Sequence, residues 1–111
     1  MLKTKKKPIE AKIRKMVRLI VKQFHPDKII LFGSRARGDA GPDSDVDLLV
    51  VMEANGAKRA KQVEIRVALR DIPVPKDITV TTPADFEWRH KLVGTIEYPA
   101  AREGKVLYER K

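Results

Sequence analysis

Two aspartates, Asp45 and Asp47, are separated by a single residue and followed by an apolar run from Leu48 to Met52. In a β-strand, residues two positions apart point to the same face of the sheet, so a strand over 45–52 would place both carboxylates side by side. Neighbouring carboxylates raise each other's pKa unless a cation lies between them, and carboxylate oxygens are ligands that suit Mg²⁺. The spacing therefore predicts a divalent metal site. Two acids in a loop at the entrance of a strand, with Asp45 capping a turn, would show the same spacing.

A Gly-Ser pair, Gly33-Ser34, lies ten residues before the acidic pair and directly after the β-branched and aromatic run Lys28 to Phe32. A glycine at the exit of a strand lets backbone N–H groups approach a phosphate, and the start of a helix favours an anion. The Ser34 hydroxyl can donate a hydrogen bond to the same phosphate. An ordinary strand-to-helix turn is the alternative reading of this pair. A P-loop is excluded, because no Gly-Lys-Ser or Gly-Lys-Thr follows the glycine.

Two arginines, Arg35 and Arg37, follow the Gly-Ser pair. Either could contact phosphates or a partner protein, and either could equally be a solvated surface residue. The surplus of cations extends to the whole chain, which has 24 Lys and Arg against 15 Asp and Glu and a net charge of +9. Such a surplus attracts phosphates of any kind. An ion-paired surface, as in heat-stable proteins, is the alternative interpretation.

The chain has 111 residues and no cysteine. This length suits one domain, and we predict a basic flexible tail over residues 1–7 followed by a single domain over residues 8–111. The absence of cysteine excludes a disulfide framework, a zinc–thiolate site and a cysteine nucleophile. Apolar runs reach about five residues, against roughly 20 needed to cross a bilayer, and no uninterrupted apolar stretch follows the basic start, so a signal peptide is not indicated. These features predict a cytoplasmic protein.

Periodicity and turn residues predict alternating helices and strands. Apolar residues at spacings of three and four indicate a helix that Pro8 opens and that ends near Gln23, and Asn55-Gly56 indicates a turn. Strands are predicted over 28–32, 45–52, 76–81 and 105–108, a helical turn over 35–38, and helices over 57–70, from 82 to about 91, and over 95–103. The fold class that follows is α/β or α+β, with a small mixed sheet of about three to four strands flanked by helices.

Gly33-Ser34, ten residues, and then Asp45-Val46-Asp47 resemble the signature of the DNA polymerase β-like nucleotidyltransferase superfamily. The wider string GSRARGDAGPDSDVDLLVV is similar to the minimal nucleotidyltransferase (MNT) branch, and the similarity extends to the ending EYPAAREGKVLYER. The resemblance implies a polymerase β-like nucleotidyltransferase fold over residues 8–111. It also implies that Gly33 and Ser34 hold the triphosphate of a nucleotide, with Arg35 and Arg37 beside them.

The family pattern also requires a third carboxylate on a neighbouring strand, and Asp77 is the candidate. Asp71, at a helix end before two prolines, and Asp85, better explained as a helix-start residue, are its competitors. The resemblance then implies that Asp45, Asp47 and Asp77 are catalytic and bind two Mg²⁺ ions, with Mn²⁺ as the other candidate metal. Asp77 would help to remove the proton from the attacking hydroxyl.

By this resemblance the chain is an adenylyltransferase that uses ATP. It would be the antitoxin of a HEPN/MNT toxin–antitoxin pair, and would transfer AMP to a hydroxyl, typically of a tyrosine, on a small helical HEPN-type toxin. Only 34 residues follow Asp77, so we expect another chain to present the acceptor; no nucleic acid or membrane is required. Two alternatives stay open: a nucleotide- and toxin-binding module with little catalysis, and a stand-alone transferase acting on a small molecule or another protein.

Overall fold

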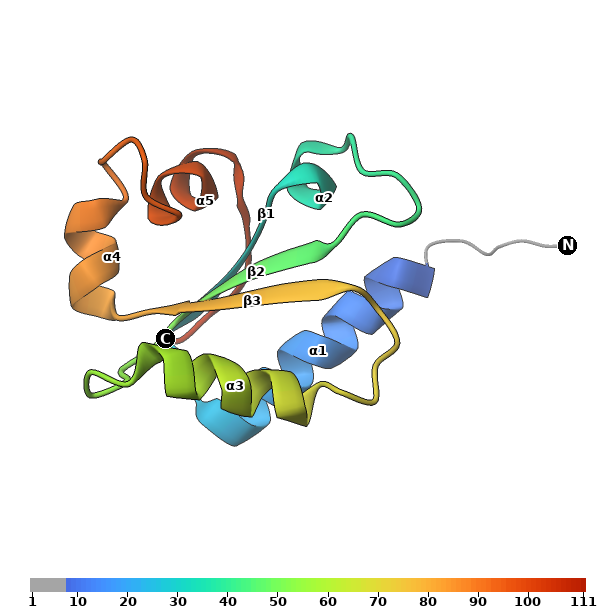
Figure 1. Cartoon of the computed structure of the whole chain (residues 1–111), viewed down its shortest axis with the longest axis horizontal. Coiled ribbons are helices and arrows are strands. Elements are labelled where there is room, and N and C mark those ends of the chain that lie inside the picture. The colour runs from blue at the N-terminus through green and yellow to red at the C-terminus, as the bar shows by residue number, and fades with distance from the viewer. Residues whose placement is uncertain (1–7) are drawn as a thin grey trace, which may run out of the picture.

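The computed structural model describes residues 8–111, and the predicted basic tail over residues 1–7 lies outside this range. Helices and strands follow one another along the chain in the predicted order, with two successive helices, α4 and α5, before the last strand (Figure 1). Their ends agree with the predicted boundaries to within two residues. The elements are α1 Pro8–Phe24, β1 Lys28–Phe32, α2 Ser34–Arg37, β2 Val46–Val51, α3 Lys58–Ala68, β3 Lys76–Thr81, α4 Pro83–Arg89, α5 Glu97–Glu103 and β4 Lys105–Glu109.

The strands form one mixed sheet in the order β3-β2-β1-β4. β1 pairs with β2 and β4 in antiparallel fashion, whereas β2 and β3 are parallel. The parallel pair needs a crossover, which α3 supplies. The predicted class, α/β or α+β with a small mixed sheet of about three to four strands flanked by helices, is therefore confirmed, and the sheet has four strands.

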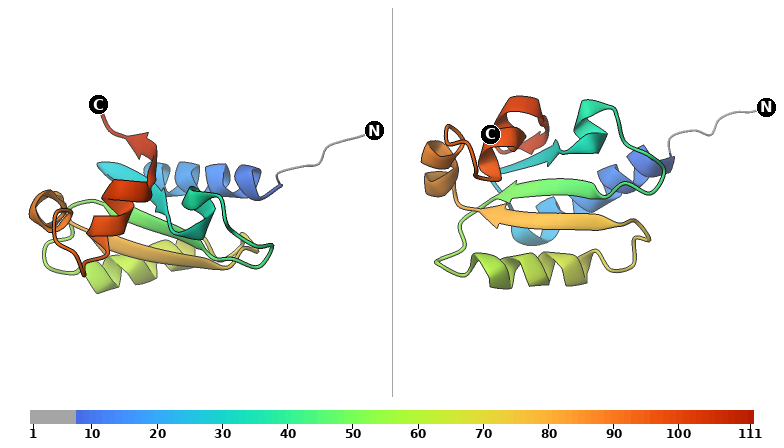
Figure 2. Two further views of the ribbon diagram at one scale, coloured as in Figure 1. Left: turned by 90° about the horizontal axis from the view of Figure 1, so that it is seen from above. Right: turned by 45° about the horizontal axis from the view of Figure 1, so that its top comes forward.

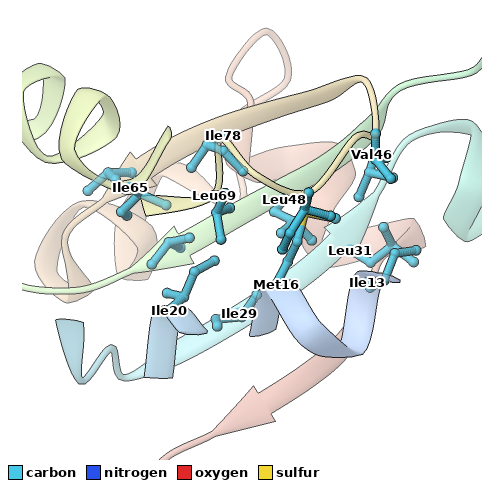
Figure 3. Close-up of a cluster of buried hydrophobic side chains, with 14 of the residues drawn as sticks. Ile13, Met16, Ile20, Ile29, Leu31, Val46, Leu48, Ile65, Leu69 and Ile78 are labelled. Atoms are coloured by element: carbon cyan, nitrogen blue, oxygen red, sulfur yellow. The ribbon is translucent and has the colours of Figure 1, made fainter. Parts of the chain in front are cut away.

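The main hydrophobic core lies between one face of the sheet and the two longest helices, α1 and α3. The predicted apolar stripe of α1 is buried there through Ile13, Met16 and Ile20. Figure 3 shows Met16 and Ile20 gathered on this face with Leu69 and the strand residues Ile29 and Leu48, and Ile13 beside Leu31. Burial on this scale is the dominant favourable term in folding, so this face serves stability.

The opposite face of the sheet is covered only in part. Ile30 and Leu49 pack there against Ala100 of α5. Gly104, directly after α5, allows this close approach, because a Cβ at that position would lie 2.5 Å from Cγ2 of Ile30 and 3.0 Å from the carbonyl oxygen of Leu31. Figure 2 shows α4 at the end of the sheet where β3 finishes. The start of β3, which carries Asp77, lies at the other end of the sheet.

The predicted strand over 45–52 is one residue too long at each end, because β2 is Val46–Val51. Asp45 therefore precedes the strand. The amide of Val46 donates to the carbonyl of Pro75 at 2.9 Å, but Pro75 has no N–H with which to continue the ladder. Within residues 8–111, no helix is long and apolar enough to cross a membrane.

Candidate active site

Gly33 and Asp47 are brought together by the antiparallel pairing of β1 with β2. Phe32, the last residue of β1, lies opposite Asp47, so the next residue is held beside the carboxylate. Gly33 has φ 77° and ψ −159°, a region open essentially to glycine alone. A Cβ at this position would approach the Oδ2 atom of Asp47 to 2.3 Å. Gly33 of the Gly-Ser turn thus lies directly against the carboxylate of Asp47.

Asp47 also faces Asp77 across the sheet. The parallel register of β2 and β3 makes these two residues direct Cα partners. The pKa of Asp47 is raised, first by its partial burial and then by the negative charges of Asp77 and Asp45. The positive charge of Arg37 acts in the opposite direction. The charges of Asp45 and Asp77 therefore both act on the Asp47 carboxylate, which places the three predicted aspartates in one acidic cluster.

The two competing acids lie in other surroundings. Asp71 is exposed and lines a groove with Gln23 and Phe24. Asp85 accepts a hydrogen bond from Nζ of Lys58 at 2.7 Å, and its own N–H donates to the Thr82 hydroxyl at 3.1 Å. Asp85 is thus a helix-start residue, as its sequence context indicates. Of the three candidates for the third carboxylate, Asp77 is the one paired with Asp47.

The donor chemistry of the cluster fits a divalent metal, although the carboxylates do not converge on a common point. Carboxylate oxygens are suited to Mg²⁺ and Mn²⁺. The pKa of Asp47 is raised first by partial burial and then by the charges of Asp77 and Asp45, and a cation there would offset both. Among the described residues, however, no three His, Cys, Asp or Glu side chains are arranged to hold a metal ion. Oδ1 of Asp77 instead forms an ion pair with Nη2 of Arg66 at 3.1 Å.

Arg37 lies within electrostatic reach of the acidic cluster. Its guanidinium donates to Asp39 at 3.2 Å and to Glu103 of α5 at 3.3 Å. Its charge also lowers the pKa of Asp47. Ser34 is the first residue of α2. Contact of Ser34 and Arg37 with a triphosphate stays a prediction.

Arg35 points elsewhere. Its guanidinium donates to the carbonyl of Ser44 through Nε at 3.2 Å and Nη2 at 2.9 Å. It therefore holds the loop in front of Asp45, which differs from the predicted contact with phosphates. A hollow of about 380 Å³ beside Arg35 lies on the face of the sheet that α1 covers. Ile13, Leu31 and neighbouring residues line it, and none of the three aspartates does.

Two charged residues with defined partners carried no sequence signal: Arg66, which contacts Asp77, and Glu97, which lies at the far end of β3 from the site. Arg66 is one of several basic residues on α3, and its pairing with Asp77 depends on how α3 lies against the edge strand β3. Glu97 is 2% exposed; it accepts hydrogen bonds from the Thr81 hydroxyl at 2.6 Å and from Nε of Arg89 at 3.0 Å. This network ties α5 to β3 and α4.

Comparison with known proteins agrees with this geometry. Residues 13–101 match the family model described as nucleotidyltransferase domain. A stretch of 44 residues is 46% identical to a protein of Methanocaldococcus jannaschii that is provisionally named a protein adenylyltransferase. That stretch covers 40% of this chain and 44% of the relative, so the match spans less than half the relative's length.

Two solved structures resemble the whole chain. One, from Sulfolobus solfataricus and provisionally named a nucleotidyltransferase, has a TM-score of 0.63 at 21% identity and covers 96% of this chain and 91% of its own. The other is a double Asp-to-Glu mutant of the toxin–antitoxin complex MntA-HpeT, with a TM-score of 0.54 at 18% identity, covering 88% of this chain and 73% of its own. At these identities the two structures establish a shared fold.

Proposed function

Because this chain belongs to the nucleotidyltransferase domain family, we propose that it moves a nucleoside monophosphate from a nucleoside triphosphate to an acceptor hydroxyl with the help of two divalent metal ions. The observation that carries the proposal is the contact of Gly33 with the carboxylate of Asp47. A turn that can bind phosphate here lies next to acids that can bind metal ions. A triphosphate with its bound metal ions needs both kinds of group side by side.

Each residue of the site has a distinct role in this proposal. Gly33 and Ser34 bind the triphosphate, and Arg37 adds positive charge beside it. Asp45 and Asp47 hold the metal ions, and Asp77 shares one of them while helping to take the proton of the acceptor. When bound, Mg²⁺ or Mn²⁺ would neutralise phosphate charge and lower the pKa of the acceptor hydroxyl.

We further propose that the nucleotide is ATP and that the acceptor is a hydroxyl, such as that of a tyrosine, on a small helical toxin of the HEPN class. The protein would then be the antitoxin of that pair. The named adenylyltransferase relative supports the nucleotide, and the shared fold with one component of a toxin–antitoxin structure supports the type of partner.

A second function is favoured by one specific contact. The ion pair between Arg66 and Asp77 at 3.1 Å occupies the third carboxylate. If that pair persists in the presence of nucleotide, the protein would bind nucleotide and partner with little catalysis.

The deciding experiment incubates the protein with ATP, Mg²⁺ or Mn²⁺ and the product of the neighbouring gene, and follows the intact mass of that product. A gain of one or more AMP units, absent with Asp47→Asn, supports the transferase and identifies its target. A stable complex with no mass gain and no pyrophosphate release supports the binding module. Pyrophosphate release with an unmodified partner supports a transferase that acts on another acceptor.

A further inference from the structure

One arginine joins the two halves of the candidate site. The segment 38–45, here called the carboxylate loop, connects α2 to β2 and ends at Asp45. The Arg35 guanidinium donates to the carbonyl of Ser44 through both Nε and Nη2, at 3.2 and 2.9 Å. Nη2 also lies 3.4 Å from the carbonyls of Gly41 and Pro42. A single side chain therefore contacts three carbonyls of the carboxylate loop.

These contacts connect the two sequence motifs of the candidate site. Arg35 directly follows the Gly33-Ser34 turn, here called the phosphate turn. Ser44 directly precedes Asp45 of the acidic pair. Inside the carboxylate loop, the amide of Gly41 donates to Oγ of Ser44 at 2.9 Å, and the amide of Ser44 donates back to Gly41 at 3.2 Å. This turn shapes the loop but does not attach it to α2. The start of the loop is held to α2 by the amides of Gly38 and Asp39, which donate to the carbonyl of Ser34 at 3.0 and 3.1 Å. The Arg35 guanidinium attaches the far end of the loop, next to Asp45.

The chemistry of the contact requires arginine. A guanidinium presents five N–H donors in a rigid planar fork, so it can serve several carbonyls at once. A lysine ammonium is a single point with three donors on a flexible stem, and it could reach one of these carbonyls but not the set. Arg35 is partly buried, whereas most residues of the carboxylate loop are exposed. Asp45 is therefore held on one side by the Arg35 contacts to Ser44 and on the other by the bond from the amide of Val46 to Pro75.

We propose that Arg35 is a positioning residue that holds the carboxylate loop against α2 and thereby sets Asp45 relative to the phosphate turn. This role rests on the proposed function, because the position of Asp45 affects metal binding only if its carboxylate is a metal ligand. Arg35 itself contacts neither metal nor nucleotide in this role. It acts through the backbone of Ser44.

The test uses Arg35→Ala, Arg35→Lys and the control Arg14→Ala in the full chain. Arg14 is an exposed arginine that lines the same hollow as Arg35, so its loss removes the same charge without releasing the loop. Two quantities are measured: amide hydrogen exchange of residues 39–45, and Mn²⁺ affinity by electron paramagnetic resonance. Thermal unfolding of each variant is followed in parallel.

With Arg35→Ala we expect faster exchange confined to the carboxylate loop and Mn²⁺ affinity lower by about tenfold, as for other residues that orient metal ligands. Arg35→Lys should restore part of both, and Arg14→Ala should change neither. Unchanged loop exchange in Arg35→Ala, or an equal loss of Mn²⁺ affinity in Arg14→Ala, would overturn the proposal. If Arg35→Ala does not fold, Arg35→Lys decides by the same two measurements.

The two proposals fail in different ways. If the wild-type chain does not bind Mn²⁺, the proposed function fails, while hydrogen exchange still tests the attachment of the loop. If the wild-type chain binds Mn²⁺ and Arg35→Ala binds it equally well, the positioning role fails and the proposed function is untouched.

Discussion

The carboxylate of Asp47 lies where a side chain at position 33 would have to be placed. A Cβ on Gly33 would come within 2.3 Å of Oδ2 and 3.2 Å of Cγ of Asp47. The backbone of Gly33 also has φ 77°, which other residues rarely adopt. Conformation and space thus both require glycine at the point where the phosphate turn meets the acidic pair.

Gly33→Ala is therefore expected to lower stability and to abolish transferase activity. The strained backbone alone costs on the order of 1–3 kcal/mol, and the contact with Asp47 must displace the carboxylate as well. Urea unfolding and pyrophosphate release measure the two effects. Gly38→Ala is the matched control, because Gly38 has φ 91° but a Cβ added there would meet nothing within 4 Å. Equal losses in both variants would show that backbone strain, rather than contact with Asp47, is responsible.

Asp47→Asn is expected to abolish metal-dependent activity without loss of stability. The pKa of Asp47 is raised in the folded protein, so above that pKa its ionised form lowers stability, and stability is regained as the pH falls through it. The asparagine removes this cost at neutral pH. We expect Mg²⁺ to raise the melting temperature of the wild type, since it binds the folded state, but not that of the variant. A variant that unfolds yet keeps its specific activity would show that the metal assignment is wrong.

Asp77→Asn is expected to lower turnover by at least about a hundredfold, the lower range for loss of a group that takes part in proton transfer. Asp71→Asn serves as its control, because Asp71 is exposed and lies beside Gln23 and Phe24, away from Asp47. The rate of pyrophosphate release at saturating ATP and Mn²⁺ is the measurement. Loss of activity in Asp71→Asn with a normal rate in Asp77→Asn would reverse the choice of third carboxylate.

Arg66→Ala is expected to leave activity intact and to tighten Mn²⁺ binding by up to about fivefold. The pair with Asp77 is roughly half exposed on both sides, and such pairs contribute about 0–1 kcal/mol, so a metal ion has little to overcome in displacing Arg66. Mn²⁺ titrations of Arg66→Ala and wild type measure the difference. A large loss of activity in Arg66→Ala would assign Arg66 a direct role in binding substrate.

Glu97 should make the stability of the protein depend on pH in the acidic range. Burial raises its pKa, but hydrogen bonds from Thr81 and Arg89 outweigh this, and the net pKa lies below 4.5. Its contribution is therefore complete above the unfolded value of 4.5 and is lost as the pH falls through the folded pKa.

Glu97→Gln is expected to lower the free energy of unfolding by about 1–3 kcal/mol near neutral pH, because the amide leaves a buried group poorly paired. The difference from wild type should narrow as the pH falls below 4.5. Urea unfolding of both proteins at several pH values measures this difference in the free energy of unfolding. A difference that does not change with pH would mean that Glu97 stabilises α5 by packing alone.

Local patterns in the sequence were enough to predict the order of the elements and to find the acidic and glycine-containing motifs. Both follow from interactions between residues close in the chain: the apolar period of α1, the β-branched runs of the strands, and the start of α4 at Thr82-Pro83. The resemblance to nucleotidyltransferases added Asp77, which lies 30 residues beyond Asp47 and has no local signal of its own.

Which side chains meet depends instead on tertiary packing. The register of the sheet places Asp77 opposite Asp47, the packing of α3 on β3 brings Arg66 to Asp77, and the fold of the 38–45 loop turns Arg35 toward the carbonyl of Ser44. A long charged side chain can reach partners in many directions, and its own sequence neighbours do not choose among them. The burial of apolar faces that are far apart in the chain fixes where each helix and strand lies. The positions of the helices and strands then determine which charged side chains are close enough to pair.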